Sequence, residues 1–346
     1  MDAPVDLLII GQGLAGSVLA CEARDRGMSI HVIDQGHAHA ASMVAAGMWN
    51  PVSFRKIIEV WKAKEVMHFL QNRYPKWEKD LGAFFFHPKP VARVFPNEEY
   101  ADLWKKRISE GMSWITLGTK DLPGANHPHG YGLVPDAGFV HLPHFLAAVR
   151  DRLKEENALS EEVFEEDRLV FKDDCWNYGE IRVKHVVLSV GTSGMQLKNM
   201  EGLPLRTNKG EVLDVRADAW KEDLTLNNGK WMLPYSDGTL KLGATYEWQR
   251  ADLETTAENR EMLIAKMNMA YPGEIEVIEH KAGLRPTVKD RRPLVGKLPS
   301  GLFSFNGLGT RGVLIAPYLA NELLSHLLEG KTLDPEIDIQ RFLKKL

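Results

Sequence analysis

The fold of this chain is decided by residues 5–35, which read VDLLIIGQGLAGSVLACEARDRGMSIHVIDQ. The first six residues are mostly apolar and stop at Gly11, a pattern typical of a strand buried on both faces of a parallel sheet. Apolar residues then recur every three or four positions from Leu14 to Ala23, which predicts an amphipathic helix opened by the glycines. A second strand is predicted over 29–33, and it ends at Asp34.

Three glycines of this stretch suit a dinucleotide site. Gly11 allows a tight turn, Gly13 lets the backbone approach a pyrophosphate, and Gly16 lets helix and strand pack closely. The phosphates are expected at the helix N-terminus, where free N–H groups and the helix dipole favour negative charge. Asp34 is placed to accept hydrogen bonds from ribose hydroxyls. The sequence therefore predicts a dinucleotide site, and the alternative is a purely structural glycine turn.

Composition narrows the class of protein. With 346 residues the chain can bury a large core, as two domains or as one domain with a large insertion. A net charge of −4 gives no basic field for phosphate backbones, which disfavours a dedicated nucleic-acid binder. The only cysteines are Cys21 and Cys175, so neither a disulfide framework nor a cysteine metal site is expected, as is usual in a reducing compartment.

Localisation and metal binding can be assessed from three short segments. Residues 1–4 carry no basic n-region and the apolar run ends at Gly11, so a signal peptide is not expected. Segment 313–328 contains polar residues and is not expected to span a bilayer. His37 and His39 have no accompanying ligand set, so no metal site is expected. We therefore expect a cytoplasmic protein without a membrane span.

A group of strands in the second half of the chain predicts an antiparallel sheet. Residues 209–215, 230–234 and 239–243 alternate with period two, and the last two runs flank a turn and form a hairpin. Residues 274–280 are expected to join this sheet, and 251–271 is a candidate helix between them.

Other segments extend the predicted parallel sheet and its covering helices. Helical periodicity occurs over 54–73 and 141–155. Residues 181–190 form a buried strand that ends in a second glycine turn at Gly191, which is either a second approach to the dinucleotide or only a turn at the sheet edge. A final long helix is expected to stop at Gly330.

Further motifs occur in a recognisable order along the chain. They are SMVAAGMWNP (42–51), KGEV (209–212), PYSDG (234–238) with GAT (243–245), GLRPT (283–287) and GLGTRGVLIAP (307–317). In these motifs the chain resembles the FAD-dependent D-amino-acid oxidase superfamily, which includes glycine and sarcosine oxidases. The last motif is similar to the oxidase domain of the bifunctional enzyme that completes the aminomethyl modification of wobble uridine in tRNA.

The resemblance implies an α/β fold with two interleaved parts. A Rossmann-type FAD-binding domain would comprise residues 1–75, 140–208 and 281–346. An α+β substrate-binding domain built on the antiparallel sheet would comprise residues 76–139 and 209–280.

The resemblance also implies FAD as cofactor. Because the C-terminal third, where related sarcosine oxidases attach their flavin, has no cysteine, the FAD is expected to be non-covalent. The expected contacts are Gly11, Gly13, Leu14, Ala15, Gly16, Asp34, Gln35, Ser42, Ala45, Ala46, Gly47, Met48, Leu169, Ser189, Gly191, Arg285, Gly307, Gly309, Thr310, Arg311, Gly312, Val313 and Leu314.

Substrate binding is expected to depend on Arg285. In the family this position of the GLRP motif grips the substrate carboxylate, and the planar guanidinium suits a bidentate pair. The alternative is a structural salt bridge. Trp231, Tyr235 and Tyr246 stand where the chain departs from its relatives, and they either line the pocket or only pack in the sheet.

The resemblance predicts an FAD-dependent oxidoreductase that oxidises the C–N bond of a small amino acid or N-substituted glycine to an imine. Hydride would pass to the flavin, with oxygen as the acceptor. The alternatives are an oxidase acting on a carboxymethylaminomethyl group of modified tRNA, a non-catalytic flavin-binding protein, and an NAD-dependent dehydrogenase. The oligomeric state is not set by the sequence.

Overall fold

The predicted strand–helix–strand unit is present in the structure, a computed structural model that describes residues 3–36, 40–235 and 238–343. It consists of β1 (Val5–Ile10), α1 (Leu14–Asp25) and β2 (Ile30–Ile33). β1 pairs in parallel with β2 on one side and with β14 (Ile181–Leu188) on the other. The last four residues of β1 are buried, as expected for a strand covered on both faces.

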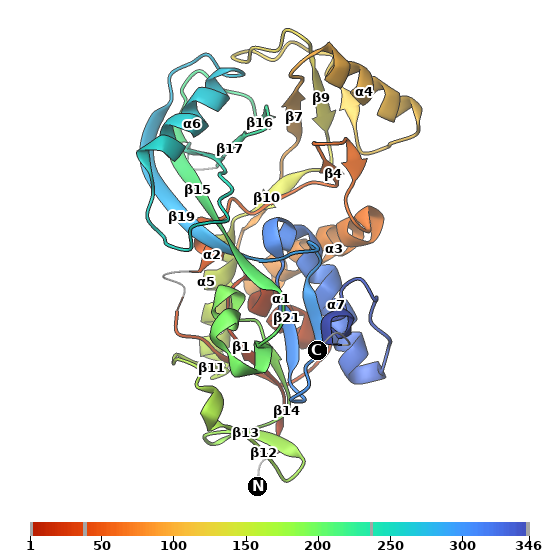
Figure 1. Ribbon diagram of the computed structural model, residues 1–346, viewed down its shortest axis with the longest axis vertical. Helices are drawn as coiled ribbons and strands as arrows, with labels where there is room; N and C mark the ends of the chain where they lie inside the picture. Colours follow the sequence, from red (N-terminus) through yellow and green to blue (C-terminus); the bar gives the residue numbers. More distant parts are fainter. Residues whose placement is uncertain (1–2, 37–39, 236–237, 344–346) are drawn as a thin grey trace.

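The first sheet surrounds this unit and lies near both chain ends in the lower half of Figure 1. Its described strands follow the order β11-β2-β1-β14-β13-β12, and β21 pairs with β14 and with β20. Parallel pairs join β11, β2, β1, β14 and β21, which confirms the predicted α/β class. The remaining strands are β11 (Leu159–Ser160), β12 (Leu169–Lys172), β13 (Cys175–Tyr178), β20 (Leu294–Lys297) and β21 (Phe303–Asn306).

A second sheet occupies the upper half of Figure 1 and is almost entirely antiparallel. Its order is β19-β15-β18-β17-β16-β7-β9-β8, and the β16–β7 pair is parallel. The predicted hairpin is formed by β17 and β18, although its turn residues 236–237 lie outside the described residues. The strands are β7 (Val91–Val94), β8 (Thr116–Leu117), β9 (Tyr131–Val134), β15 (Leu205–Arg216), β16 (Thr225–Asn227), β17 (Trp231–Pro234), β18 (Leu240–Gly243) and β19 (Glu276–Val288).

Smaller elements connect and cover the two sheets. The short strands are β3 (Met48–Trp49), β4 (Val52–Ser53), β5 (Ile58–Glu59), β6 (Phe86–Pro88) and β10 (Gly138–Val140). The α-helices are α2 (Ala41–Val44), α3 (Ala63–Leu81), α4 (Glu98–Ser109), α5 (Leu142–Glu155), α6 (Ala257–Asn268), α7 (Gly312–Glu329) and α8 (Gln340–Leu343). The 3-10 turns are η1 (Glu166–Arg168), η2 (Gly191–Gln196), η3 (Lys198–Met200) and η4 (Gly309–Arg311).

Two long strands, β15 and β19, pair with each other and run from the second sheet toward the first (Figure 1). Their register places Asn208 opposite Arg285, and Gly210 opposite Gly283. The expected domain limits after residues 208 and 280 fall inside these strands, and the limit after 75 falls inside α3. We keep the division into cofactor and substrate domains as a proposal, with β15 and β19 shared between them.

One helix differs from its predicted position. The helix expected over 54–73 begins only at Ala63 and continues to Leu81. Ile57 and Lys62 have left-handed backbone, with φ of 48° and 47°, which a continuous α-helix cannot contain. The apolar periodicity of 54–62 belongs instead to turns and to β5.

The other predicted helices are present with shifted ends. The helix expected over 251–271 is shortened to α6, because the Thr256 side chain accepts a hydrogen bond from Asn259 N (3.2 Å) and caps its start. α5 closely matches the range 141–155. α7 ends at Gly330, whose left-handed conformation (φ 69°) closes the helix as expected.

One apolar core cluster lies between the first sheet and α1, α3, α5 and α7. Its aromatic centre contains Tyr74, Trp77 and Phe145, which contact one another edge to face or stacked. Burying each such ring stabilises the fold by about 1.5–3 kcal/mol, so this core holds the helices against the sheet. Among the described residues, no helix combines the length and the apolar character needed to cross a bilayer.

Candidate functional site

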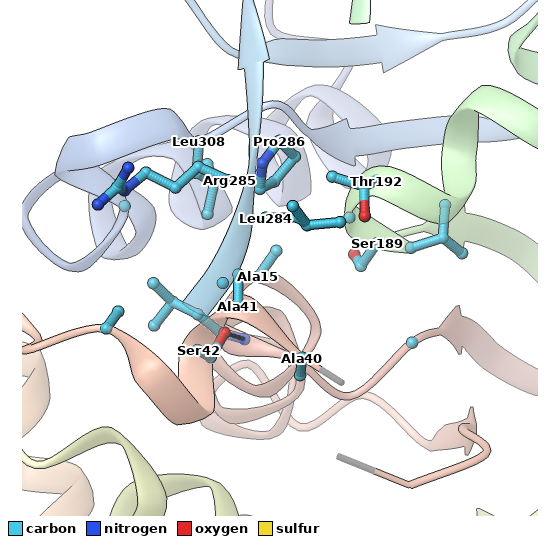
Figure 2. Close-up of a pocket in the computed structure, with 18 of the residues that line it drawn as sticks. Ala15, Ala40, Ala41, Ser42, Ser189, Thr192, Leu284, Arg285, Pro286 and Leu308 are labelled. Carbon is cyan, nitrogen blue, oxygen red and sulfur yellow. Dashed lines mark hydrogen bonds between the residues drawn. The ribbon is translucent and has the colours of Figure 1, made fainter. Parts of the chain in front are cut away.

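A cavity of about 800 Å³ lies where the two sheets meet. Its walls come from the carboxyl ends of β1 and β2, from α2, from the turn after β14, from the β15–β19 pair and from the start of α7. Figure 2 shows α2, with Ala41 and Ser42, facing Leu284 and Pro286 of β19. In this view Ser189 and Thr192 lie on one side of Leu284, and the Arg285 side chain extends to the other.

The glycine turn between β1 and α1 forms one end of the cavity. Gly11 has a positive φ of 95°, and a Cβ there would lie 2.7 Å from Ser189 O. A Cβ on Gly16 would lie 1.8 Å from Gly11 O, so this glycine is needed for close packing. Gly13 is the N-cap residue of α1, and because it has no side chain it cannot cap the helix with a side-chain hydrogen bond. The first helical amide, Leu14 N, donates to Ser42 Oγ (3.1 Å). The turn therefore presents backbone to the cavity, as an anion site requires.

Asp34 lies at the cavity wall after β2. Its Oδ2 accepts a hydrogen bond from Gln12 N (2.8 Å), and its Oδ1 accepts from Gly36 N (2.8 Å) and from Arg150 Nη1 (2.9 Å). These bonds fix the carboxylate beside the glycine turn. Arg150 was not predicted from the sequence, because it lies on α5, a helix without a recognisable motif.

The second glycine turn also reaches the cavity. Gly191, Thr192 and Ser193 of η2 line it, which favours a second approach to the ligand over a simple edge turn. Glu162, Val163 and Phe164 line the cavity as well. The sequence alone favours a solvated surface segment for the acidic residues from Glu161 onward. Gly191 is an expected contact, whereas Thr192, Ser193 and residues 162–164 could not be assigned from sequence, because their place at the cavity depends on how the first sheet is assembled.

The residues present fit a dinucleotide cofactor such as FAD. Ser189 is 5% exposed and its Oγ has no hydrogen-bond partner within the described residues, so a polar ligand atom would satisfy it. The start of α1 would hold the pyrophosphate and Asp34 the ribose. Neither Cys21 nor Cys175 lines the cavity. Within ranges 3–36, 40–235 and 238–343 no cluster of three metal-binding side chains occurs, and His37 and His39 lie outside the described residues.

The start of α7 closes another wall. Gly309, Thr310, Gly312 and Val313 line the cavity, and Gly309 has a positive φ of 62°. α7 begins without a side-chain cap. Its free N–H groups and positive dipole end therefore favour negative charge on a ligand at this wall.

Arg285 is held in a defined position at the β15–β19 end of the cavity. Its Nη1 donates to Asn208 Oδ1 (3.0 Å) and to Thr245 O (3.2 Å), and its guanidinium carbon lies 4.8 Å from the centre of the Tyr246 ring. Burial lowers the pKa of the Arg285 guanidinium from its usual value. No Asp or Glu of the described chain lies within salt-bridge distance of it, so the alternative of a structural salt bridge finds no partner there.

The three aromatic candidates have different surroundings. Trp231 and Tyr246 line the cavity, and Tyr246 is 57% exposed. Tyr235 is buried, packs on Phe139 and donates its hydroxyl hydrogen to Ala46 O (3.2 Å), so it supports the wall from behind.

The structure brings most of the expected cofactor contacts to the cavity: Gly11, Gly13, Leu14, Ala15, Asp34, Gln35, Ser42, Ala45, Ala46, Gly47, Met48, Ser189, Gly191, Arg285, Gly309, Thr310, Gly312 and Val313. Five expected contacts do not line it: Gly16, Leu169, Gly307, Arg311 and Leu314. Leu169 lies on β12, at the edge of the first sheet. Leu314 is buried in the apolar core, and a Cβ on Gly307 would meet Val288 rather than the cavity.

Comparisons with known proteins agree with this geometry. The family model described as FAD dependent oxidoreductase matches residues 6–325. The glycine oxidase of Pseudomonas aeruginosa is 25% identical, with 96% of this chain and 96% of the relative covered. The solved glycine oxidase of Geobacillus kaustophilus has a TM-score of 0.78 and 22% identity, with 99% of this chain and 98% of that chain covered, and it shares the fold.

A second group of relatives is longer than this chain. The tRNA 5-methylaminomethyl-2-thiouridine biosynthesis bifunctional protein of Marinobacter nauticus is 21% identical, with 93% of this chain but 55% of the relative covered. The chain therefore spans about half the length of this relative.

Proposed function

Because the chain belongs to the family of FAD dependent oxidoreductases, we propose that it oxidises the C–N bond of a small amino acid or an N-substituted glycine to an imine, with oxygen as the final electron acceptor. The chain is an enzyme of the amino-acid oxidase type and its cofactor is FAD. FAD, when bound, supplies the acceptor for the hydride that leaves the α carbon. The proposal is carried by one observation, the Arg285 guanidinium at the cavity wall without an acidic partner among the described residues.

Arg285 would bind the substrate carboxylate. Its planar fork matches the two oxygens of a carboxylate, and each charge-assisted bond contributes about 1.5–3 kcal/mol. Asn208 and Thr245 hold the guanidinium through Nη1, so the group is positioned before substrate binds. A fixed carboxylate restricts the orientation of the α carbon, and positioning of this kind supplies much of the rate in such reactions.

Among the described lining residues, no His, Asp or Glu lies near Arg285 as an evident general base. The acidic lining residues of the cavity are Asp34 and Glu162, and Asp34 is already bonded to Gln12, Gly36 and Arg150 beside the glycine turn. We therefore expect the substrate amine to bind in its neutral form. The imine product would be hydrolysed by water after release.

An anaerobic screen of glycine, sarcosine, proline and D-amino acids tests the proposal. At least one of them should bleach the absorbance of the bound FAD. The Arg285→Met variant should keep its FAD but lose most reduction by carboxylated amines, by about 100-fold or more. Arg285→Lys, which keeps the charge but loses the planar fork, should fall between the two. Equal reduction rates in all three proteins would remove Arg285 from the substrate site.

A second candidate substrate is a carboxymethylaminomethyl group on tRNA. It is favoured by the match to the bifunctional tRNA protein and by two exposed aromatic side chains, Tyr246 (57%) and Trp248 (59%), on which a base could stack. Transfer RNA carrying this group would then reduce the FAD while free amino acids would not. A protein whose FAD is reduced by no amine and no tRNA would instead be a non-catalytic flavin binder.

A further inference from the structure

Two cations lie over the Tyr246 ring, and a third is buried nearby. The Arg285 guanidinium of β19 lies 4.8 Å from the ring centre, and the Nζ of Lys230, just before β17, lies 6.0 Å from it. Arg311, at the start of α7, is the third. Burial lowers the pKa of the Arg311 guanidinium, and the nearby Tyr246 phenol partly opposes this effect.

None of these cations has an acidic partner within the described chain. Lys230 donates to Ala244 O (2.7 Å) and Arg311 Nη1 to Asn50 O (3.4 Å), both of which are neutral carbonyls. Burial, followed by the nearby charge of Arg285, lowers the pKa of Lys230. Partly buried cations without counter-ions are unfavourable, so this cluster is arranged for anions that are not part of the chain.

Nearby lysines of the same sheet show the contrast. Lys241 bonds Asp214 (2.7 Å), and Lys281 bonds both Asp214 (3.2 Å) and Glu279 (2.6 Å). Lys241 and Lys281, which do not line the cavity, are thus each neutralised by carboxylates of the chain. Lys230 and Arg311 do not themselves line the cavity, but they lie directly behind its wall. Their neighbours line it: Trp231 and Ala244 beside Lys230, and Thr310 and Gly312 beside Arg311.

We propose that the substrate is a dicarboxylic amine, with one carboxylate on Arg285 and the second drawn to Lys230 and Arg311. This inference rests on the amine oxidation proposed above and specifies its substrate class. A single carboxylate has two oxygens, and the fork of Arg285 occupies both, which leaves Lys230 and Arg311 without a counter-ion. A second carboxylate, on the far side of the amine, would be the counter-ion for these two cations.

Two amines of matched shape isolate this effect. Iminodiacetate and N-ethylglycine have the same skeleton, except that a carboxylate in the first replaces a methyl group in the second. With FAD bound, iminodiacetate should have a dissociation constant about 10- to 100-fold lower, measured from the substrate dependence of anaerobic FAD reduction. The difference should shrink as salt is added, because the charges that cause it are only partly buried.

Single substitutions test which residues cause the tighter binding of iminodiacetate. Lys230→Met and Arg311→Met should each raise the dissociation constant of iminodiacetate about tenfold more than that of N-ethylglycine, whereas Arg285→Met should weaken both. Lys281→Met is the matched control, since Lys281 lies on the same strand as Arg285 but is already paired with Asp214 and Glu279. It should leave the ratio of the two constants unchanged.

A binding measurement provides a readout independent of turnover. Titration of the FAD-loaded protein with succinate and with propionate, followed by the shift of the FAD absorbance, should show tighter binding of succinate, and Lys230→Met and Arg311→Met should reduce this preference. Equal constants for iminodiacetate and N-ethylglycine, or equal changes for both in the two variants, would overturn the inference. If no amine reduces the FAD but succinate keeps its preference through Lys230 and Arg311, the anion subsite stands and the amine oxidation fails.

Discussion

A substitution at Gly210 should displace the guanidinium of Arg285 without removing the side chain. Gly210 lies on β15, and the guanidinium of Arg285 from β19 covers its Cα. In Gly210→Ala the new Cβ would lie 2.0 Å from Nη2, 2.1 Å from Nη1 and 2.3 Å from Cζ of Arg285. Ordinary contacts occur at about 3.5 Å, so the guanidinium must move by about 1.5 Å.

The expected loss follows from this displacement. The bonds of Nη1 to Asn208 Oδ1 (3.0 Å) and Thr245 O (3.2 Å) cannot both survive such a movement. Misplacing a substrate-binding group by about 1 Å costs about 100-fold in rate, which corresponds to about 2.7 kcal/mol. The clash involves the end of a flexible side chain, and Ala suits a strand better than Gly by about 0.5–1 kcal/mol. Losing one of the two charge-assisted bonds costs about 1.5–3 kcal/mol, so the free energy of unfolding should fall by about 0.5–2.5 kcal/mol.

The assay is anaerobic stopped-flow reduction of the bound FAD by the best amine from the screen, together with urea unfolding and FAD content. The control is a double-mutant cycle. In an Arg285→Ala background, Gly210→Ala has no guanidinium to displace and should add little further loss. Normal reduction kinetics in a folded, FAD-loaded Gly210→Ala protein, or full additivity in the cycle, would refute the role given to Arg285.

Three further predictions concern the residues expected to hold FAD and the stability of the protein. In Gly16→Ala the Cβ would meet the backbone oxygen of Gly11 at 1.8 Å, so unfolding free energy should fall by about 3 kcal/mol or more and FAD content should drop; a normal melting temperature would contradict the close packing. Ser189→Ala should weaken FAD binding about 2- to 10-fold in a fluorescence titration, because it removes the unpaired hydroxyl, and an unchanged affinity would show that FAD leaves this hydroxyl unbonded. Burial lowers the pKa of His141 to about 4, so the unfolded chain takes up the proton first and stability should fall as pH decreases from 6.5 to 4. His141→Asn keeps an acceptor to cap α5 and should flatten this dependence in urea unfolding at pH 7 and 5, whereas an unchanged slope would assign it to other groups.

Features that depend on neighbouring residues could be predicted from the sequence. The turn from Gly11 to Gly16 and the position of Asp34 follow from strand, helix and glycine requirements within one short stretch. The β17–β18 hairpin and the end of α7 at Gly330 follow in the same way from period-two alternation and from the left-handed C-terminal residue. The resemblance to the FAD-dependent family added Arg285, which local patterns alone do not identify.

The start of α3 shows where local patterns failed. Apolar spacing over 54–62 satisfied a helical period, yet Ile57 and Lys62 adopt left-handed backbone and the segment forms turns. The choice between the two arrangements depends on burial of Ile57 in a cluster with residues far along the chain. Periodicity over a few residues carries no information about such partners.

The sequence by itself determined the nucleotide-binding unit, the class of the fold and the family. Only the tertiary structure decided the partners of the site: Arg150 on Asp34, Asn208 and Thr245 on Arg285, and the approach of Lys230 and Arg311 to Tyr246. The physical reason is that these contacts join residues far apart in the chain. Their distances are set by which strands pair and in which register, and alternation along a strand does not specify its neighbour.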